Sequence, residues 1–208
     1  MKIIKKFEDL KIELSNSKNL GFVPTMGYLH NGHISIIKSS QKKCKTTLVS
    51  IFVNPAQFNK KTDFKTYPKN IKKDILLLKR LKVDYLFLPN NKTIYKNKSD
   101  MKVNINNKDK ILCAKFRTGH FQGVLAVINQ FLTNINANYM FLGEKDFQQI
   151  FLIKKFIKKK FKTVIITCKT IRDSNKVALS SRNDLLSKAK LKNSSSVWSL
   201  YFIVFTLF

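Results

Sequence analysis

Acidic residues are scarce in this 208-residue chain, where 12 aspartates and glutamates face 40 lysines and arginines, for a formal net charge of +28. Taken alone, that excess favours an anionic partner such as nucleic acid or a membrane surface. Arginine is also rare, with four copies, and the lysines are spread through every segment instead of lining one helix or loop. A compositional drift toward lysine, asparagine and isoleucine explains this better than a nucleic-acid surface, for which the sequence has no recognition motif. We therefore expect no nucleic-acid partner, although the charge should attract phosphates and carboxylates.

Cysteine is nearly absent, and so are long apolar runs. Cys44, Cys113 and Cys168 lie far apart and outside any Cys-x-x-Cys spacing, which predicts neither a disulfide framework nor a zinc site and fits a reducing compartment. The basic N-terminus has no continuous apolar run and no small-residue cleavage site, so we expect no signal peptide. The apolar tail at 197–208 is shorter than the roughly 20 residues that span a bilayer. We expect a cytoplasmic protein without a membrane partner.

The rest of the chain alternates apolar strands with amphipathic helices. Its length and its 44% hydrophobic content predict one main globular domain. Nearly continuous apolar strands are typical of a parallel sheet buried on both faces, so the expected fold class is α/β with helices on both faces. Residues 90–110 are polar and lack periodicity, which predicts a surface excursion or an edge hairpin around 101–105. We expect helices at 3–14, 30–43, 71–81, 124–132 and 150–157, and strands at 20–23, 46–53, 84–88, 137–142 and 163–167.

The most informative stretch is the strand, loop and helix around a His-x-Gly-His sequence. The strand Leu20 to Val23 meets Pro24, which we expect to end it, and a glycine-framed turn then opens into a helix. The first N–H groups of such a helix are unpaired and suited to hold phosphate. His30 and His33 could donate hydrogen bonds to one phosphate chain, while Gly32 between them would let a nucleotide approach closely. The alternative is a capped surface helix with two solvated histidines.

Polar residues also follow three other strands, at the edge where open α/β sheets bind ligands. Gln57 follows Asn-Pro and is either a substrate contact or an amide that ties down the turn. Lys145 could neutralise phosphate and Asp146 could accept from ribose hydroxyls or hold Mg²⁺, unless both belong to a solvated helix start. The run Ser180 to Arg182 offers a second phosphate clamp or, alternatively, an N-capped turn before a helix.

Together these motifs resemble the pantothenate synthetase family, the pantoate–β-alanine ligases of the His-x-Gly-His nucleotidyltransferase group. The resemblance covers roughly residues 3–186. It rests on five motifs in the family's order, which are Val-Pro-Thr-Met-Gly-Tyr-Leu-His-Asn-Gly-His, Phe-Val-Asn-Pro-Ala-Gln-Phe, Arg117 to Gly123, Gly-Glu-Lys-Asp-Phe-Gln-Gln and Leu-Ser-Ser-Arg-Asn. Five ordered motifs are far more specific than one.

The resemblance implies a Rossmann-like fold and an ATP-dependent ligase of pantothenate biosynthesis, the route to a coenzyme A precursor. Pantoate would attack the α-phosphorus of ATP to give pantoyl adenylate and pyrophosphate, and β-alanine would then displace AMP. The implied small molecules are ATP, pantoate, β-alanine and Mg²⁺, and the implied assembly is a homodimer. The alternatives are adenylyl transfer to another acceptor, a basic nucleic-acid-binding protein and an inactive remnant.

The resemblance also implies roles for individual residues. His33 would be catalytic, as proton donor to the departing phosphate. Gln57 and Gln149 would hold pantoate, with Gln57 also meeting β-alanine. Asp74 matches a carboxylate associated with Mg²⁺, and Arg117 would be a further anion contact. The ATP-binding residues would be Met26, Gly27, Tyr28, Leu29, His30, Asn31, Gly32, His33, Gly143, Glu144, Lys145, Asp146, Ile171, Leu179, Ser180, Ser181 and Arg182.

The chain departs from the family pattern at its end. Family members continue after the Ser-Ser-Arg motif into a smaller domain that covers the active site, whereas here only a short segment follows. We therefore expect a Rossmann-like nucleotide- and pantoate-binding domain over 1–172. Residues 173–208 would form a hinge and a truncated remnant of a C-terminal lid domain that is largely missing, which would impair the activity.

Overall fold

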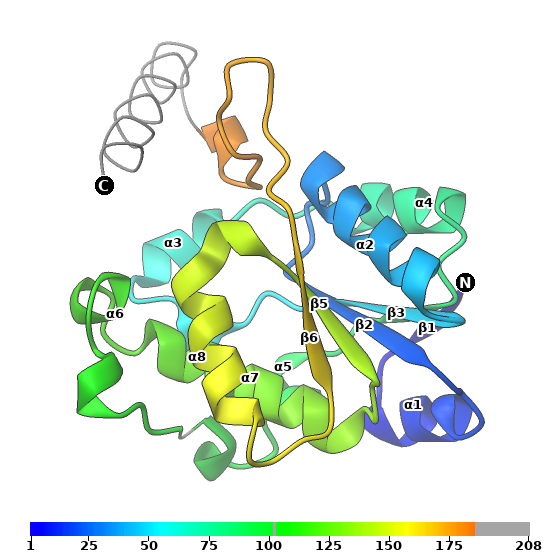
Figure 1. Ribbon diagram of the computed structural model, residues 1–208, viewed down its shortest axis with the longest axis horizontal. Coiled ribbons are helices and arrows are strands. Elements are labelled where there is room, and N and C mark those ends of the chain that lie inside the picture. Colours follow the sequence, from blue (N-terminus) through cyan, green and yellow to red (C-terminus); the bar gives the residue numbers. More distant parts are fainter. Residues whose placement is uncertain (102, 186–208) are drawn as a thin grey trace.

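A six-stranded sheet with strand order β1-β4-β3-β2-β5-β6 organises the chain (Figure 1). The computed structural model describes residues 1–101 and 103–185. Every recorded pairing between neighbouring strands of this sheet is parallel. The strands are β1 (Lys2–Ile4), β2 (Leu20–Thr25), β3 (Thr46–Ile51), β4 (Tyr85–Phe87), β5 (Tyr139–Gly143) and β6 (Val164–Cys168).

Helices connect these strands and cover both faces of the sheet (Figure 1). The α-helices are α1 (Phe7–Leu14), α2 (Asn31–Lys43), α3 (Lys61–Thr66), α4 (Ile71–Arg80), α5 (Asn91–Ile94), α6 (Cys113–Phe116), α7 (His120–Asn134) and α8 (Phe147–Ile157). Short 3-10 turns are η1 (Pro55–Gln57), η2 (Lys98–Met101), η3 (Asn107–Asp109), η4 (Glu144–Asp146) and η5 (Asn183–Leu185).

Alternate residues of each central strand enter different cores, because successive side chains point to opposite faces. Phe22 of β2 and Met140 of β5 pack with α1, α5, α7 and α8. Their neighbours Val23 and Phe141 pack on the other face with α2 and α4. This two-sided burial confirms the expected Rossmann-like α/β sheet.

The sheet also fixes where a ligand can bind. After β2, the chain builds β3 and β4 on one side, and it then returns through α7 to place β5 on the other side of β2. The carboxyl ends of β2 and β5 therefore meet where the direction of winding reverses, which is the usual ligand site of such sheets.

The expected helix over residues 3–14 was wrong at its start. Lys2–Ile4 is a strand, with Ile3 opposite Leu86 of β4, and α1 begins only at Phe7. Two adjacent isoleucines fit either a strand or a helix face, and the open edge of β4 decides between them.

Pro24 does not end its strand, contrary to expectation, because β2 continues to Thr25. The Thr25 carbonyl accepts from the Phe52 N–H on the β3 side at 3.0 Å, so the nitrogen of Pro24 faces β5. The recorded β2–β5 pairs end at Phe22 and Met140. The missing N–H of Pro24 therefore falls where no ladder bond is needed.

The stretch at 90–110 contains α5, η2 and η3, and its described residues show no edge hairpin around 101–105. Helix α3 was not predicted, and the expected helix near residue 185 is the short turn η5 as far as it is described. The apolar tail at 197–208 and most of the expected lid remnant lie outside the described residues. Within the described parts of the chain, no helix is long and apolar enough to cross a membrane.

Candidate functional site

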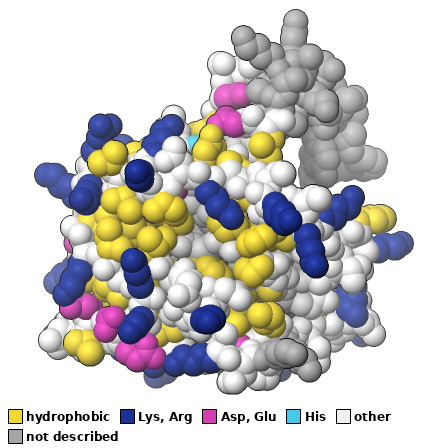
Figure 2. All heavy atoms as spheres, turned by 180° about the vertical axis from the view of Figure 1, so that it is seen from behind, with side chains coloured by type: hydrophobic (Ala, Val, Ile, Leu, Met, Phe, Trp, Pro, Cys, Tyr) yellow, Lys and Arg dark blue, Asp and Glu magenta, His cyan; other side chains and the backbone are white. Residues whose placement is uncertain are grey.

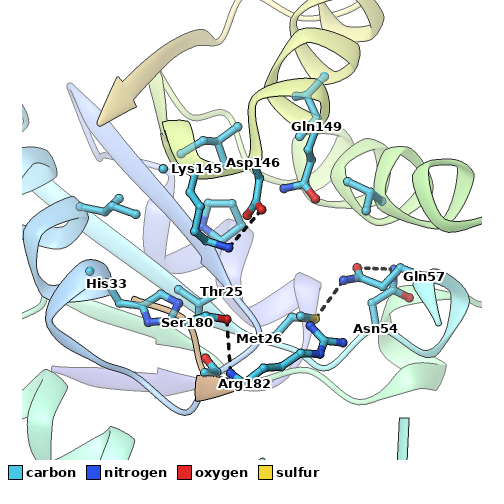
Figure 3. A pocket seen from close by; sticks show the side chains of 18 of the residues that line it. Thr25, Met26, His33, Asn54, Gln57, Lys145, Asp146, Gln149, Ser180 and Arg182 are labelled. Atoms are coloured by element: carbon cyan, nitrogen blue, oxygen red, sulfur yellow. Dashed lines mark hydrogen bonds and ion pairs between the residues drawn. The ribbon is translucent and has the colours of Figure 1, made fainter. Parts of the chain in front are cut away.

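A cavity of about 270 Å³ opens at the carboxyl edge, among the segments that follow β2, β3, β5 and β6 (Figure 3). In that view His33 lies on one side and Gln57 on the other, with Lys145, Asp146 and Gln149 above them. The cavity therefore unites motifs far apart in the sequence. The predicted site residues that line it are Met26, His30, Gly32, His33, Gln57, Gly143, Lys145, Asp146, Gln149, Ile171, Leu179, Ser180, Ser181 and Arg182.

The other predicted site residues do not line this cavity, and their assignment to ATP or metal stays a prediction. Glu144 turns away, and its carboxylate accepts from the Thr170 N–H at 3.1 Å. A second cavity, of about 300 Å³, lies behind the histidine loop. Those outside the first cavity are Gly27, Tyr28, Leu29, Asn31, Glu144 and Asp74, of which Gly27, Tyr28 and Asp74 line the second.

His30 and His33 cap the helix α2 with their own side chains. The Nδ1 of His30 accepts from the Gly32 N–H at 3.1 Å, and the Nδ1 of His33 accepts from the His30 N–H at 3.3 Å. Because each Nδ1 must offer a lone pair to a backbone donor, each neutral ring carries its proton on Nε2. Both imidazoles can therefore donate a hydrogen bond from Nε2 to a ligand.

Burial keeps both histidines neutral. It lowers the pKa of His33 to about 3, with smaller contributions from His30 and Lys145. Burial, followed by the Lys145 charge, also lowers the pKa of His30. The two rings are 4.1 Å apart between centroids, so two positive charges there would repel each other. In the free protein, His33 is thus a neutral hydrogen-bond donor.

Gly32 makes this arrangement possible. A Cβ atom at this position would lie 2.9 Å from Cε1 and 3.0 Å from Nδ1 of His30, inside normal contact distance. Gly32 also lines the cavity, and the expectation that it lets a nucleotide approach closely stays a prediction. A larger side chain would push the His30 ring off its capping position.

Asp74 holds the loop that leads into α2. Its two carboxylate oxygens accept from the Tyr28 and Leu29 N–H groups, both at 2.8 Å, and its side chain is buried. Gly27 and Tyr28 have φ values of +79° and +52°, so this turn is in the left-handed region and needs such support. Asp74 thus anchors the backbone, and this geometry does not favour its predicted role at Mg²⁺.

Gln57 is fixed by a polar cluster on the far wall of the cavity. Its side-chain amide contacts the Met26 sulfur at 3.0 Å, and its Oε1 accepts from the Asn54 amide at 3.2 Å. The same Asn54 amide donates to the Gly123 carbonyl at 2.9 Å, while Asn54 Oδ1 accepts from the Tyr95 hydroxyl at 2.9 Å. Sequence reasoning gave Asn54 no role, although a polar residue before proline at a strand end was a usable signal.

The loop after β6 brings Ser180, Ser181 and Arg182 to the cavity. The Ser181 hydroxyl donates to the Tyr28 carbonyl at 3.2 Å and is buried, so it ties this loop to the histidine loop. The Arg182 guanidinium donates to both carboxylate oxygens of Asp63, at 3.0 and 3.2 Å. Ser180 accepts from the Arg182 N–H at 3.3 Å and keeps its hydroxyl proton for a ligand.

Cations line the remaining walls. Lys145 pairs with Asp146 at 3.2 Å, and both side chains are partly exposed, so a phosphate could displace the carboxylate. Arg117 also lines the cavity, and burial lowers its pKa, followed by the charge of Arg182. Such a set of positive groups facing two imidazole donors suits a polyphosphate.

The fold and the site define an α/β protein whose His-x-Gly-His loop lines a cavity at the carboxyl edge of a parallel sheet. The Pantoate-beta-alanine ligase family matches residues 2–200. The chain is 43% identical over 202 residues to a protein named pantothenate synthetase from Francisella tularensis subsp. mediasiatica, which covers 95% of this chain and 76% of the relative. The chain belongs to the pantoate-beta-alanine ligase family.

Solved structures agree with this assignment. A pantoate-beta-alanine ligase from Francisella tularensis, complexed with beta-gamma ATP and beta-alanine, superposes with a TM-score of 0.91 at 39% identity. The match covers 96% of this chain and 78% of that one. The corresponding protein from Thermus thermophilus gives a TM-score of 0.91 at 31% identity and covers 96% and 72%.

Proposed function

We propose that this chain is an ATP-dependent ligase that condenses pantoate with β-alanine to give pantothenate. Family membership supports the reaction, and one observation in the site carries it. Two neutral imidazoles, fixed by a capping box, present Nε2 donors on one wall while Lys145 and Arg182 supply positive charge on others. That arrangement stabilises negative charge on a phosphate without forming a covalent intermediate.

The first step transfers the adenylyl group. A pantoate carboxylate oxygen attacks the α-phosphorus of ATP, the bond to the β-phosphate bridging oxygen breaks, and its electron pair leaves with pyrophosphate. Negative charge grows on the phosphate oxygens during this exchange. His33 and His30 donate hydrogen bonds to those oxygens from Nε2, and Lys145 neutralises part of the charge. Of the two, His33 would be the donor to the departing phosphate, through the proton on its Nε2.

The other residues that line the cavity would bind the remaining parts of the substrates. Gln57 and Gln149 would bind the pantoate hydroxyls, and Arg117 would meet a substrate carboxylate. The segment 143–146 with Ile171 would hold adenosine, and 179–182 would hold phosphates. Within that last segment Ser180 and Arg182 are the better candidates, because the Ser181 hydroxyl already donates to the Tyr28 carbonyl.

Mg²⁺ would enter with the nucleotide. This ion usually keeps several waters and binds through substrate phosphates and one or two carboxylates. Asp146 lines the cavity, is about half exposed and pairs only with the flexible Lys145 among the described residues, so it fits this role. When bound, the ion would neutralise phosphate charge.

We also propose a cytoplasmic homodimer with a domain division at residue 172. Exposed apolar side chains on α6 and α8, with Phe116 80% and Phe147 75% exposed, could be covered by a second copy. The division is supported by the end of the last strand, β6, at Cys168, after which the chain leaves the sheet for the loop that reaches the cavity. Sedimentation at several protein concentrations would test the dimer.

The decisive experiment measures pyrophosphate and AMP. We expect pantoate-dependent pyrophosphate release from ATP without β-alanine, and AMP and pantothenate when β-alanine is added. His33→Gln keeps the capping box, because glutamine can accept from the His30 N–H. It should lower the rate of pyrophosphate release by about 10²- to 10³-fold, the usual loss for one such donor. Pyrophosphate release that does not depend on pantoate would reject the proposed substrate.

A further inference from the structure

His120 is a third cavity histidine, and none of the roles above uses it. It is the first residue of α7 and only 6% exposed, yet its side chain lines the cavity. Its Nδ1 lies 2.7 Å from the backbone carbonyl oxygen of Gln57. It therefore stands directly beside the residue proposed to meet β-alanine.

The contact with Gln57 fixes which ring nitrogen carries the proton. A carbonyl oxygen can only accept, so Nδ1 of His120 must be the donor. Burial is the largest cause of a lowered His120 pKa, which keeps the ring neutral at physiological pH. In a neutral ring with its proton on Nδ1, Nε2 carries a lone pair. His120 thus offers a proton acceptor, whereas His30 and His33 offer donors.

That Nε2 is open to the cavity. No described residue forms a recorded hydrogen bond with it. The buried side-chain polar atoms without a partner, in the described part of the chain, are Ser50 Oγ and Gln148 Oε1. The ring lines the cavity and its Nδ1 is engaged with Gln57, so Nε2 is the ring nitrogen that can meet a ligand there.

The charged groups that face His120 come from three segments. Arg117 precedes α7, Asp146 belongs to η4, and Arg182 lies on the loop after β6. Arg117 and Arg182 oppose protonation of the ring, and Asp146 favours it. The same two arginines disfavour an ammonium ion nearby and attract a carboxylate. A β-amino acid would therefore bind here with its carboxylate toward the arginines and its amine unprotonated.

We propose that Nε2 of His120 is the general base for the amide-forming step, an inference that rests on the proposed function. The β-alanine ammonium loses one proton to solvent as it binds. Its nitrogen lone pair then attacks the carbonyl carbon of pantoyl adenylate, and Nε2 takes the second proton as the C–N bond forms. The C–O bond to AMP breaks, and its electron pair leaves with the phosphate oxygen. His120 afterwards returns its proton to solvent.

The two half-reactions can be measured separately in the full chain. The first is pyrophosphate release from ATP and pantoate, with the adenylate trapped by hydroxylamine as hydroxamate. The second is single-turnover conversion of the preformed enzyme–adenylate complex to pantothenate by β-alanine. His120→Asn is the informative variant, because its side-chain amide can still donate to the Gln57 carbonyl but cannot accept a proton. His120→Phe removes both functions.

We expect His120→Asn to form adenylate at within about threefold of the wild-type rate. Its amide-forming rate at saturating β-alanine should fall by about 10²- to 10⁴-fold, the range for loss of a general base. The loss should shrink as pH rises, because hydroxide replaces the missing acceptor. His120→Phe should impair both half-reactions, since it also releases the Gln57 backbone.

Three results would overturn the inference. Wild-type amide formation in His120→Asn would show that His120 only supports Gln57. An equal loss in both half-reactions would indicate the same structural role, and a raised KM for β-alanine with an unchanged maximal rate would indicate binding alone. If the wild-type chain forms no adenylate, the proposed function itself fails, and this base has no reaction to serve.

Discussion

Three histidines face one cavity with opposite hydrogen-bonding chemistry. His30 and His33 accept backbone N–H groups at Nδ1, which leaves donors at Nε2. His120 instead donates from Nδ1 to a carbonyl, which leaves an acceptor. One residue type can therefore stabilise phosphate charge on one wall and remove a proton on another. The backbone contact of each ring decides between these roles.

The lowered pKa of His33 predicts a pH-dependent stability. In the folded chain it is about 3, against an ordinary value of 6.5. Between these values the unfolded chain binds more protons, so this contribution is complete above about pH 6.5 and is lost as pH falls toward 3. His33→Gln removes it. When the pH is lowered to about 5, the free energy of unfolding of wild type should fall by up to about 2 kcal/mol more than that of the variant.

Urea unfolding of both proteins without ligand, at about pH 7.5 and pH 5, checks this expectation. The lowered pKa values of His30 and His120 act with the same sign in both proteins, so they cancel in the comparison. Parallel losses in the two proteins would mean that His33 is not held neutral by burial.

The variant Asp74→Asn should show whether Asp74 supports the backbone of the histidine loop or binds a metal ion. The amide nitrogen cannot accept, so the N–H of either Tyr28 or Leu29 loses its partner. We expect the free energy of unfolding to fall by about 1–3 kcal/mol and adenylate formation to slow, because the histidine loop shifts. The Mg²⁺ concentration for half-maximal activity should not change.

Asp84→Asn is a matched control. Asp84 also accepts from a backbone N–H, that of Thr47 at 2.8 Å, but at the other end of the sheet. The Asp84→Asn variant should be less stable than wild type but should form adenylate at the wild-type rate. A raised Mg²⁺ requirement in Asp74→Asn at unchanged stability would restore the family-based role of Asp74.

At the scale of elements, the sequence predicted those features that depend on local pattern. The order of strands and helices follows from apolar periodicity, and the positions of the site loops follow from strand ends. The backbone-anchoring contact of Asp74 and the contact of His120 with Gln57 were not predicted, because each joins separate segments. Asp74 meets Leu29, and His120 meets Gln57, 45 and 63 residues away along the chain. β1 was missed for the same reason, since only pairing with β4 makes it a strand.

The positions of Gln57 and His120 depend on the packing of α7 against η1. A Cβ atom at Gly123 would lie 2.2 Å from the Ala56 carbonyl oxygen and 2.7 Å from the Gln57 nitrogen. Gly123→Ala should therefore push α7 away from η1, at a cost of about 1–3 kcal/mol for overpacking. It should also weaken pantoate binding, because Gln57 shifts.

Thermal unfolding and the KM for pantoate measure the two effects. Gly119→Asn is the control, because among the described residues, its chain neighbours aside, no atom lies within 4 Å of a Cβ there, and asparagine tolerates its φ of +83°. A wild-type melting temperature and a wild-type KM in Gly123→Ala would show that the contact between α7 and η1 adapts without cost.

At the scale of the whole molecule, the charge of +28 has to be reconciled with a site for small anions. Figure 2 shows basic side chains dispersed over one face among apolar and neutral ones, without a continuous stripe. Dispersed charge raises the local concentration of any anion and speeds the encounter with ATP and pantoate. The KM for ATP should accordingly rise with ionic strength.

The same charge should bind nucleic acid only weakly and without a defined site. We expect dissociation constants for duplex and single-stranded DNA no tighter than about 10⁻⁶ M at physiological salt, with a steep salt dependence. Lys145→Gln should weaken ATP binding, because this lysine lines the cavity. It should leave DNA binding almost unchanged, since it removes one of many dispersed charges. Fluorescence anisotropy with labelled DNA, beside ATP titrations of both proteins, measures this. Submicromolar DNA binding that ATP displaces would mean that the cavity is part of a nucleic-acid site.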